Sequence, residues 1–392
     1  MTTPGPYTTS RRRLLQFGAA ALPLAALGTA LPSAVARAAT APTGAAATLT
    51  MPAETDPHVR TYMAWPALSS VWSDSLDKVR GNIADVAHEI SRFEPVVVLA
   101  RPAQAADARY LCGRGARYSI DVIEIPVDDL WIRDFGPTFL VGPGAVAGVD
   151  TNFNGWGKTG TRYAQPFAHD AAAAGILLDE YGVPRIGAGF VGEGGSLETD
   201  GEGTLLATVS SLVNPNRNPG RSQQQVEDAL RTALGITKVI WVPGLAGADI
   251  TDCHIDCLAR FTAPGRVILD KPGPGADPKW IAVYEETGRV LRSATDAQGR
   301  PLAVTELPGP DRRLIRGRGE EFLSSYTSYY TPNGAVIAPQ FGDGRADYLA
   351  RTILQAAYPA RSVVQLPIDG IAGGGGGIHC ATQSHPVAPP AR

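Results

Sequence analysis

Four short segments of this sequence carry the side chains that could do chemistry. One of them places a cysteine, Cys380, directly after His379 and a run of five glycines, Gly373 to Gly377. Glycine tolerates backbone conformations that other residues resist and lets the chain approach other groups closely. This arrangement indicates a nucleophilic thiol presented to a tight pocket. Taken alone, the same pattern also fits a flexible tail with an incidental thiol.

The other three segments supply carboxylates and a histidine. Asp134 lies in Trp131–Pro137, after a strand-like run, and the Gly-Pro pair predicts that it sits at a strand-to-loop junction. Glu193 precedes two glycines, which leave room for other groups to approach its carboxylate. His254 and Asp256 alternate in the third segment, so in a strand both side chains would point to one face.

Together these groups predict one type of reaction. A cysteine thiolate near neutral pH needs a base or a positive charge beside it, and His254 can be that partner and move protons. Glu193 can orient the imidazole, as the third group of a catalytic triad does. Asp134 and Asp256 then remain. Two fixed carboxylates beside a nucleophile suit guanidinium, a planar cation with several N–H donors, so we expect an amidine or guanidine substrate.

Hydrophobic periodicity predicts the elements that must position these residues. Five stretches have the spacing of amphipathic helices, and short β-rich runs separated by turn residues lie between them. The recurrence of strand, helix and strand indicates an α/β fold built from a structural repeat, with an ordinary α/β domain as the alternative. The expected helices are 74–93, 168–181, 222–234, 278–293 and 345–358, and the expected strands are 95–99, 120–125, 205–209, 238–242, 266–270, 335–339 and 362–366.

The N-terminus has the form of an export signal. Arg11–Arg13 precedes an Ala/Leu-rich run from Gly18 to Leu31, and Ala34–Ala36 provides a small-residue cleavage site. Two prolines interrupt the apolar run, which is too short to span a bilayer comfortably, so cleavage is favoured over a membrane anchor. We therefore predict a twin-arginine signal peptide at 1–36, a linker at 37–50, and a protein exported to the extracellular space, the cell envelope or the periplasm.

Composition narrows the classes of partner. The chain has 392 residues, 44% of them hydrophobic, which is enough for a large core. Without the predicted signal it carries 32 basic and 38 acidic residues, and this charge argues against nucleic acid as the main partner. The four cysteines are too few for a disulfide scaffold, although one pair could still form a bridge. We expect a small-molecule or peptide partner, no nucleic acid and no stable membrane insertion. The composition does not decide between a monomer and a homo-oligomer.

Read together, the motifs resemble one family. From Met51–Glu54 to Pro386 the chain is similar to the agmatine deiminase / bacterial-type peptidylarginine deiminase family of the guanidine-modifying pentein superfamily. This resemblance implies a single catalytic domain, 51–388, with a five-bladed α/β-propeller of ββαβ modules, pseudo-fivefold symmetry and a central site. It is carried by Trp131–Pro137, Asn152–Gly157, Glu193–Ser196, Asp200–Thr204, Asn214–Pro219, Thr251–Arg260, Pro339–Asp343 and Gly374–Gln383.

The resemblance also implies a reaction and a role for six side chains. The reaction is hydrolysis of the guanidinium of agmatine to N-carbamoylputrescine and ammonia through a covalent thiouronium intermediate, with no metal and no organic cofactor. The implied roles are nucleophile for Cys380, general acid and base for His254, support of His254 for Glu193, guanidinium binding for Asp134 and Asp256, and packing on the aliphatic part of the substrate for Trp131.

Several positions depart from the agmatine deiminase pattern and leave the substrate open. Gly377, Cys253, Cys257 and Ser384-His385 stand around the site where other residues are usual in that branch. The export signal adds to this, because agmatine is handled mainly in the cytoplasm. Peptidylarginine, as in protein citrullination, or another extracellular guanidine is therefore the alternative substrate.

Two remoter alternatives belong to other classes. Cys253, His254, Asp256 and Cys257 could bind zinc together with His379-Cys380, but this spacing is not a familiar zinc arrangement, and in a strand His254 would face away from both cysteines. A non-catalytic binding protein on the same scaffold is the other alternative, and the presence of all five expected active-site residues argues against it. We expect His379 to point away from the pocket, because it neighbours Cys380 on extended backbone.

Overall fold

The computed structural model describes residues 49–113, 115–315 and 319–391, all of which belong to one compact unit. The predicted signal peptide and nearly all of the predicted linker lie outside these residues. None of the helices in the described ranges combines the length and the hydropathy needed to cross a membrane.

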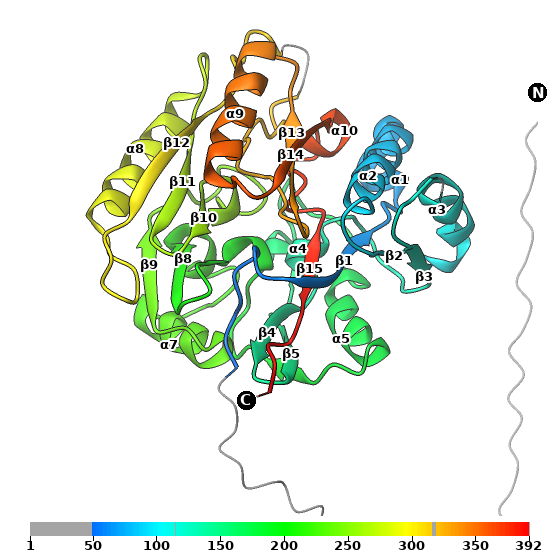
Figure 1. Ribbon diagram of the computed structural model, residues 1–392, viewed down its shortest axis with the longest axis horizontal. Helices are drawn as coiled ribbons and strands as arrows, with labels where there is room; N and C mark the ends of the chain where they lie inside the picture. The colour runs from blue at the N-terminus through cyan, green and yellow to red at the C-terminus, as the bar shows by residue number, and fades with distance from the viewer. Residues whose placement is uncertain (1–48, 114, 316–318, 392) are drawn as a thin grey trace, which may run out of the picture. The chain divides into compact units, whose positions relative to one another are not determined.

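Within the described residues the long strands form five separate sheets (Figure 1). Three of the sheets share one design, in which two antiparallel strands are followed by a helix and by a third strand parallel to the second. These sheets consist of β4 (Thr138–Gly142), β5 (Ala145–Asp150), α5 (Asp170–Glu180) and β6 (Arg185–Gly187); β7 (Glu198–Thr199), β8 (Thr204–Thr208), α7 (Gln223–Leu234) and β9 (Lys238–Val242); and β10 (Ala259–Ala263), β11 (Arg266–Lys271), α8 (Pro278–Ser293) and β12 (Ala303–Pro308).

The other two sheets are variants of this design. In one, the first strand is reduced to a bridge between Tyr330 and Ile337. In the other, β15 near the C-terminus pairs antiparallel with β1, so segments from both ends of the described chain meet in one sheet (Figure 1, red beside blue). The elements are β13 (Ala335–Gln340), α9 (Gly344–Ala357) and β14 (Ser362–Pro367); and β15 (Gln383–Pro386), β1 (His58–Ala64), α2 (Leu76–Ile90), β2 (Val96–Leu99), α3 (Ala105–Cys112) and β3 (Ile120–Ile123).

The five modules follow one another in a closed ring. β15 contacts β4, β7 contacts β10, α9 contacts β12, and α2 contacts β13 and β14. Leu140 and Val149 of the module with β4 and β5 share a hydrophobic cluster with Leu205 and Val226 of the module with β8 and α7. Figure 1 shows the short helix α4 (Ile132–Phe135) in the middle of the ring. The predicted α/β fold of five ββαβ modules is therefore confirmed.

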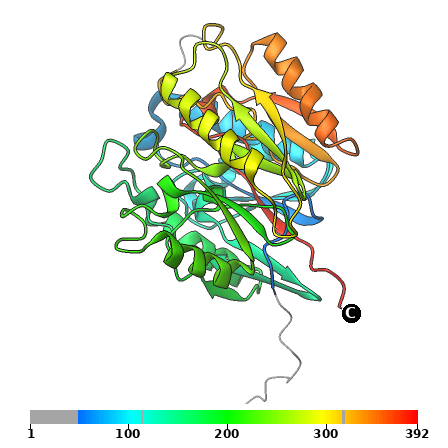
Figure 2. The ribbon, with the colours of Figure 1, turned by 90° about the vertical axis from the view of Figure 1, so that its left-hand side faces the viewer.

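The long helices begin and end where the sequence signals place them. α7 starts with a capping box between Ser222 and Gln225 and ends at Gly235, whose φ of 64° is the left-handed cap that glycine accepts readily. α8 starts at Pro278 after the N-cap Asp277. Figure 2 shows α8 lying along the outer side of its sheet, and it contacts β11 and β12. All five predicted helices are present within a few residues of the expected ends.

The interior is packed in three hydrophobic clusters that lie between the helices and the sheets. The largest joins β1, β2 and α2 to β13 and α9, and it reaches Trp131 and Cys380 at the centre. The second lies between β5, β8 and α7, and the third between β9, β10, β11 and α8. The rigid layers thus surround the loops that carry the four chemical motifs.

Candidate active site

A cavity of about 740 Å³ brings five of the six predicted site residues to one surface. Cys380, His254, Asp134, Asp256 and Trp131 all line it. The sixth, Glu193, is completely buried and lies behind the wall, against His254. The structure therefore places all six side chains of the sequence-based hypothesis in one site, although their catalytic roles stay predictions.

The glycine run before Cys380 makes room for aromatic rings. A Cβ atom on Gly376 would lie 2.2 Å from the ring of Trp131, and one on Gly374 would lie 2.3 Å from the ring of Trp72. Such distances are impossible without a shift of the indole rings or of the backbone. The two rings also pack on each other, with 5.9 Å between their centroids. The glycines thus let the segment before the nucleophile lie directly against a rigid aromatic wall.

His254 lies on a strained turn and not in the expected strand. Asp252 and Cys253 have φ values of 59° and 71°, in the left-handed region that non-glycine residues rarely adopt, and Ile255–Cys257 forms a single 3-10 turn. The strand prediction was wrong, yet the turn still directs His254 and Asp256 into one cavity.

The imidazole of His254 is enclosed by carboxylates. Its Nε2 lies 3.2 Å from Glu193 Oε2, and its Nδ1 lies 3.6 Å from Asp134 Oδ1. Burial lowers the pKa of His254, but the negative charges of Asp134, Glu193 and Asp256 outweigh burial and raise it to about 9. His254 is therefore protonated at neutral pH, as a group that must donate a proton requires.

Glu193 is fixed by a buried arginine that the sequence reasoning assigned no role. Arg217 donates from Nε to both oxygens of Glu193, at 2.8 and 3.1 Å, and from Nη1 to Asp252 at 2.8 Å. Burial raises the pKa of Glu193, but the charge of Arg217 and the bond to His254 outweigh burial and leave it below the ordinary value. Glu193 is thus an ionised support for the imidazolium of His254.

Asp134 lies on the helical turn α4, and not at the end of a strand as expected. Its Oδ2 accepts a hydrogen bond from Trp156 Nε1 at 2.8 Å, and its Oδ1 accepts one from the backbone N–H of Gly195 at 3.1 Å. A Cβ atom on Gly195 would lie 2.6 Å from Asp134 Oδ1 and 2.7 Å from His254 Nδ1, so only glycine fits there. Burial raises the pKa of Asp134 to about 6, even though the charge of His254 opposes this.

Asp256 lies beside the thiol and keeps one oxygen free. Its Oδ2 is 3.8 Å from Cys380 Sγ and 2.7 Å from His379 Nδ1. Its Oδ1 is buried and has no hydrogen-bond partner. Burial raises the pKa of Asp256, but His379, His254 and Arg260 outweigh burial and hold it at about 2. Asp256 is therefore ionised, and among the described residues one of its two oxygens has no hydrogen-bond partner.

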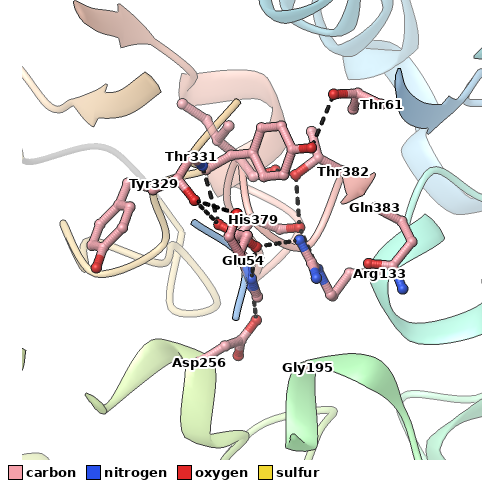
Figure 3. Close-up of polar contacts among 12 residues, drawn as sticks. Glu54, Thr61, Arg133, Gly195, Asp256, Tyr329, Thr331, His379, Thr382 and Gln383 are labelled. Carbon is pink, nitrogen blue, oxygen red and sulfur yellow. Dashed lines mark hydrogen bonds and ion pairs between the residues drawn. The ribbon is translucent and has the colours of Figure 1, made fainter. Parts of the chain in front are cut away.

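His379 does not line the cavity, as predicted, but its ring contacts Asp256 from behind the site. The other ring nitrogen, Nε2, lies 2.8 Å from Glu54 Oε2, and Glu54 also accepts a hydrogen bond from Arg133 at 2.6 Å (Figure 3). Glu54 accepts another from Arg260 at 3.0 Å. Burial raises the pKa of Glu54, but these cations outweigh burial and hold it well below its usual range. His379 thus ties Asp256 to a buried charged cluster behind the site.

The sequence reasoning missed four residues that position the site. Glu54 and Arg217 lay in quoted family motifs but received no role, and Trp156 lay in another. Buried charges are nearly always paired, so the charged residue in the otherwise uncharged Met51–Glu54 and Asn214–Pro219 motifs was the available signal for Glu54 and Arg217. The fourth residue is Ser328, whose Oγ lies 3.9 Å from Cys380 Sγ. No signal in the sequence pointed to it.

The zinc arrangement considered from the sequence is not formed. Among the described residues, the cluster of potential metal ligands does not include His254 or Cys253. That cluster consists of Asp256, Cys257 and Cys380.

The comparisons with known proteins agree with this geometry. The model of the Porphyromonas-type peptidyl-arginine deiminase family matches residues 50–386. The agmatine deiminase of Stutzerimonas stutzeri is 40% identical over 357 residues, covering 86% of this chain and 95% of that protein, and the agmatine deiminase of Medicago truncatula is 38% identical over 366 residues, covering 86% and 96%. The structure of agmatine deiminase of Enterococcus faecalis superposes with a TM-score of 0.81 at 31% identity, covering 86% and 96% of the two chains.

Proposed function

The chain belongs to the Porphyromonas-type peptidyl-arginine deiminase family, and we propose that it is an agmatine deiminase, which hydrolyses the guanidinium of agmatine to N-carbamoylputrescine and ammonia. One observation carries the proposal. A thiol, an imidazolium and two carboxylates, those of Cys380, His254, Asp134 and Asp256, line a single cavity. We further propose that the reaction serves putrescine biosynthesis, because N-carbamoylputrescine is putrescine that carries one carbamoyl group.

The carboxylates define how the guanidinium binds. Asp256 and Asp134 both line the cavity, and the two oxygens of Asp134 are held by hydrogen bonds from Trp156 and Gly195. A guanidinium between these carboxylates makes charge-assisted hydrogen bonds to both, which fixes its plane in front of Cys380. Trp131 forms part of the same cavity wall and packs on the methylene groups of the substrate.

The chemistry follows from the groups around the bound guanidinium. The Cys380 thiolate attacks the guanidinium carbon, and His254 gives its proton to the nitrogen that leaves as ammonia. A thiouronium remains bonded to Cys380. His254, now neutral, takes a proton from a water molecule that attacks the same carbon. The bond to sulfur then breaks, which releases the ureido product and regenerates the thiolate, with His254 protonated again. The remaining hydroxyl proton of the adduct passes to solvent, where ammonia takes it up as ammonium.

The charge of the cavity favours agmatine over free arginine. Agmatine carries an ammonium at the end of its chain, whereas arginine adds a carboxylate. Beyond the two guanidinium-binding aspartates and the His254 imidazolium, the described residues lining the cavity include five acidic and three basic side chains, so carboxylates are available to pair with the terminal ammonium of agmatine. The acidic residues are Asp249, Asp270, Asp277, Glu320 and Glu321, and the basic ones are Arg162, Lys279 and Arg312.

A second candidate function is deimination of peptidyl-arginine. The name of the matching family model and the export signal predicted from the sequence favour it. The experiment measures ammonia release by the purified protein from agmatine, from free arginine and from an arginine-containing peptide, with Cys380→Ala as the control. Release mainly from agmatine supports the proposal. Preference for the peptide would replace agmatine deimination with the second function. No ammonia release from any of the three substrates would contradict both functions.

For localisation we propose export by the twin-arginine route, on the grounds of Arg11–Arg13, the apolar run and the Ala34–Ala36 cleavage site. Mass spectrometry of the N-terminus of the protein recovered outside the cytoplasm tests this. A chain that begins after Ala36 supports the proposal, and a cell-associated chain that retains Arg11–Arg13 contradicts it.

A further inference from the structure

A second thiol lies beside the nucleophile, and the reaction proposed above does not use it. One sulfur or oxygen atom from each of Cys257, Cys380 and Asp256 lies within 4.8 Å of the other two. All three residues line the cavity, so an ion in the cavity can reach them. Cys257 follows Asp256 directly in the 3-10 turn, which explains how the two side chains arrive at the same point.

The donor set has the chemistry of a soft divalent cation site. Thiolates select Zn²⁺ and Cd²⁺ over Mg²⁺ and Ca²⁺, and a carboxylate is a common additional zinc ligand. Asp256 Oδ2 is held by His379, while its buried Oδ1 has no partner in the described structure. The unpartnered oxygen belongs to the same carboxylate whose Oδ2 lies 3.8 Å from Cys380 Sγ, and it is an independent sign that this carboxylate can bind a cation.

We propose that Cys257, Cys380 and Asp256 form a Zn²⁺-binding site that blocks the nucleophile. Three protein ligands leave a fourth position for water, and each thiol that coordinates the ion releases its proton to solvent. The ion and a guanidinium compete, because both occupy the space beside Cys380 and both interact with Asp256. Zn²⁺ is therefore an inhibitor of this chain, and Cys257 sets the sensitivity to it.

Direct binding provides the first test, and it does not depend on turnover. The purified protein, kept reduced with a phosphine, is titrated with Zn²⁺ by calorimetry and with Cd²⁺ by the sulfur-to-metal charge-transfer absorption. We expect one ion per chain, no response to Mg²⁺, and binding at least about ten-fold weaker in Cys257→Ser, because one thiolate is lost. Cys112→Ala, which removes a buried thiol from α3, is the matched control and should bind like the wild type.

Equal Zn²⁺ affinity of the wild type and Cys257→Ser, or no binding to the wild type, overturns the proposal. The second test rests on the proposed function and measures Zn²⁺ inhibition of ammonia release from agmatine. We expect inhibition that competes with agmatine, that a chelator reverses, and that needs about ten-fold more Zn²⁺ in Cys257→Ser relative to its own uninhibited rate. An active enzyme that Zn²⁺ inhibits equally with and without Cys257 contradicts this inference alone. An inactive protein that binds Zn²⁺ through Cys257 contradicts the proposed function alone.

Discussion

His379 lies between two carboxylates, with Nδ1 at 2.7 Å from Asp256 and Nε2 at 2.8 Å from Glu54. Glu54 in turn accepts hydrogen bonds from Arg133 (Figure 3) and from Arg260. The position of Asp256 beside the thiol therefore depends on a charged cluster built from β10, α4 and the segment before β1. We therefore expect His379, the residue next to the proposed nucleophile in sequence, to position Asp256 for substrate binding.

The first prediction concerns this histidine. In His379→Ala, Asp256 loses its charge-assisted hydrogen bond, which is worth about 1.5–3 kcal/mol, so kcat/KM for agmatine should fall roughly ten- to a hundred-fold. The effect should lie mostly in KM, because the Asp256 carboxylate that binds the guanidinium is no longer held in position. Steady-state kinetics measure this.

His379→Asn is the control, because its amide can still donate to Asp256. It should recover part of the loss in KM. If His379→Ala lowers only thermal stability and leaves KM unchanged, the residue has a purely structural role.

The second prediction is a bell-shaped pH profile of kcat/KM. Asp134 must be ionised to hold guanidinium, and burial raises its pKa to about 6, so activity should fall as the pH drops below that value. His254 must be protonated to release ammonia, and its pKa is raised to about 9, so activity should fall above that value. Rates measured across this range, at constant ionic strength, test both limbs. A profile that rises through a pKa near 7, as for an unperturbed histidine base, would contradict the account.

The third prediction separates the acid limb from the alkaline limb. Trp156→Phe removes the donor to Asp134 Oδ2, so the carboxylate loses stabilisation and its pKa rises further. The acid limb should therefore move to higher pH while the alkaline limb changes less. Trp241→Phe is the matched control, since its indole donates to Glu227 outside the site. An identical shift in both variants would argue against a specific role for Trp156.

The fourth prediction concerns the support of His254. Glu193→Gln removes a negative charge at 3.2 Å from Nε2, so the pKa of His254 should fall and the alkaline limb should move to lower pH. kcat should fall as well, because Arg217 then faces a neutral amide in a buried position. The pH profile distinguishes this from general damage, which would lower the rate at every pH and leave the alkaline limb in place.

The fifth prediction tests the packing of the glycine run. Gly376→Ala would place a Cβ atom 2.2 Å from the Trp131 ring, so we expect a loss of stability of about 1–3 kcal/mol and a higher KM as the ring is displaced. Gly373→Ala is the control, because its nearest contact would be 3.3 Å away, at a backbone oxygen. Denaturant unfolding and KM together measure the effect, and equal behaviour of the two variants would contradict it.

The repeating elements of the fold were predictable because their signals are local. Helical periodicity, caps and β-rich runs placed five helices and seven strands, while weak strands such as β7, with two residues, and β15, which pairs with β1, carry too little local signal. The single helical turn α4 around Asp134 was missed for the same reason: four residues show no period.

The site was predictable in its residues but not in its geometry. The side chains of Cys380, His254, Glu193, Asp134 and Asp256 stood out by type, and those of Cys380, Glu193 and Asp134 also by nearby glycines. The contacts among Glu54, His379 and Asp256 join segments hundreds of residues apart, and no local pattern encodes such pairings. The positive φ values at Asp252 and Cys253 turned an expected strand into a turn, because the folded environment imposes a conformation that these residue types disfavour.

Trapping the covalent intermediate tests the central claim most directly. The purified protein is mixed with agmatine, quenched in acid during turnover, digested and examined by mass spectrometry, with Cys380→Ala treated in the same way. The account predicts that the peptide containing Cys380 gains the mass of agmatine less ammonia, and that Cys380→Ala neither gains mass nor releases ammonia. Sustained ammonia release by Cys380→Ala, or an adduct on Cys257 in place of Cys380, would contradict it.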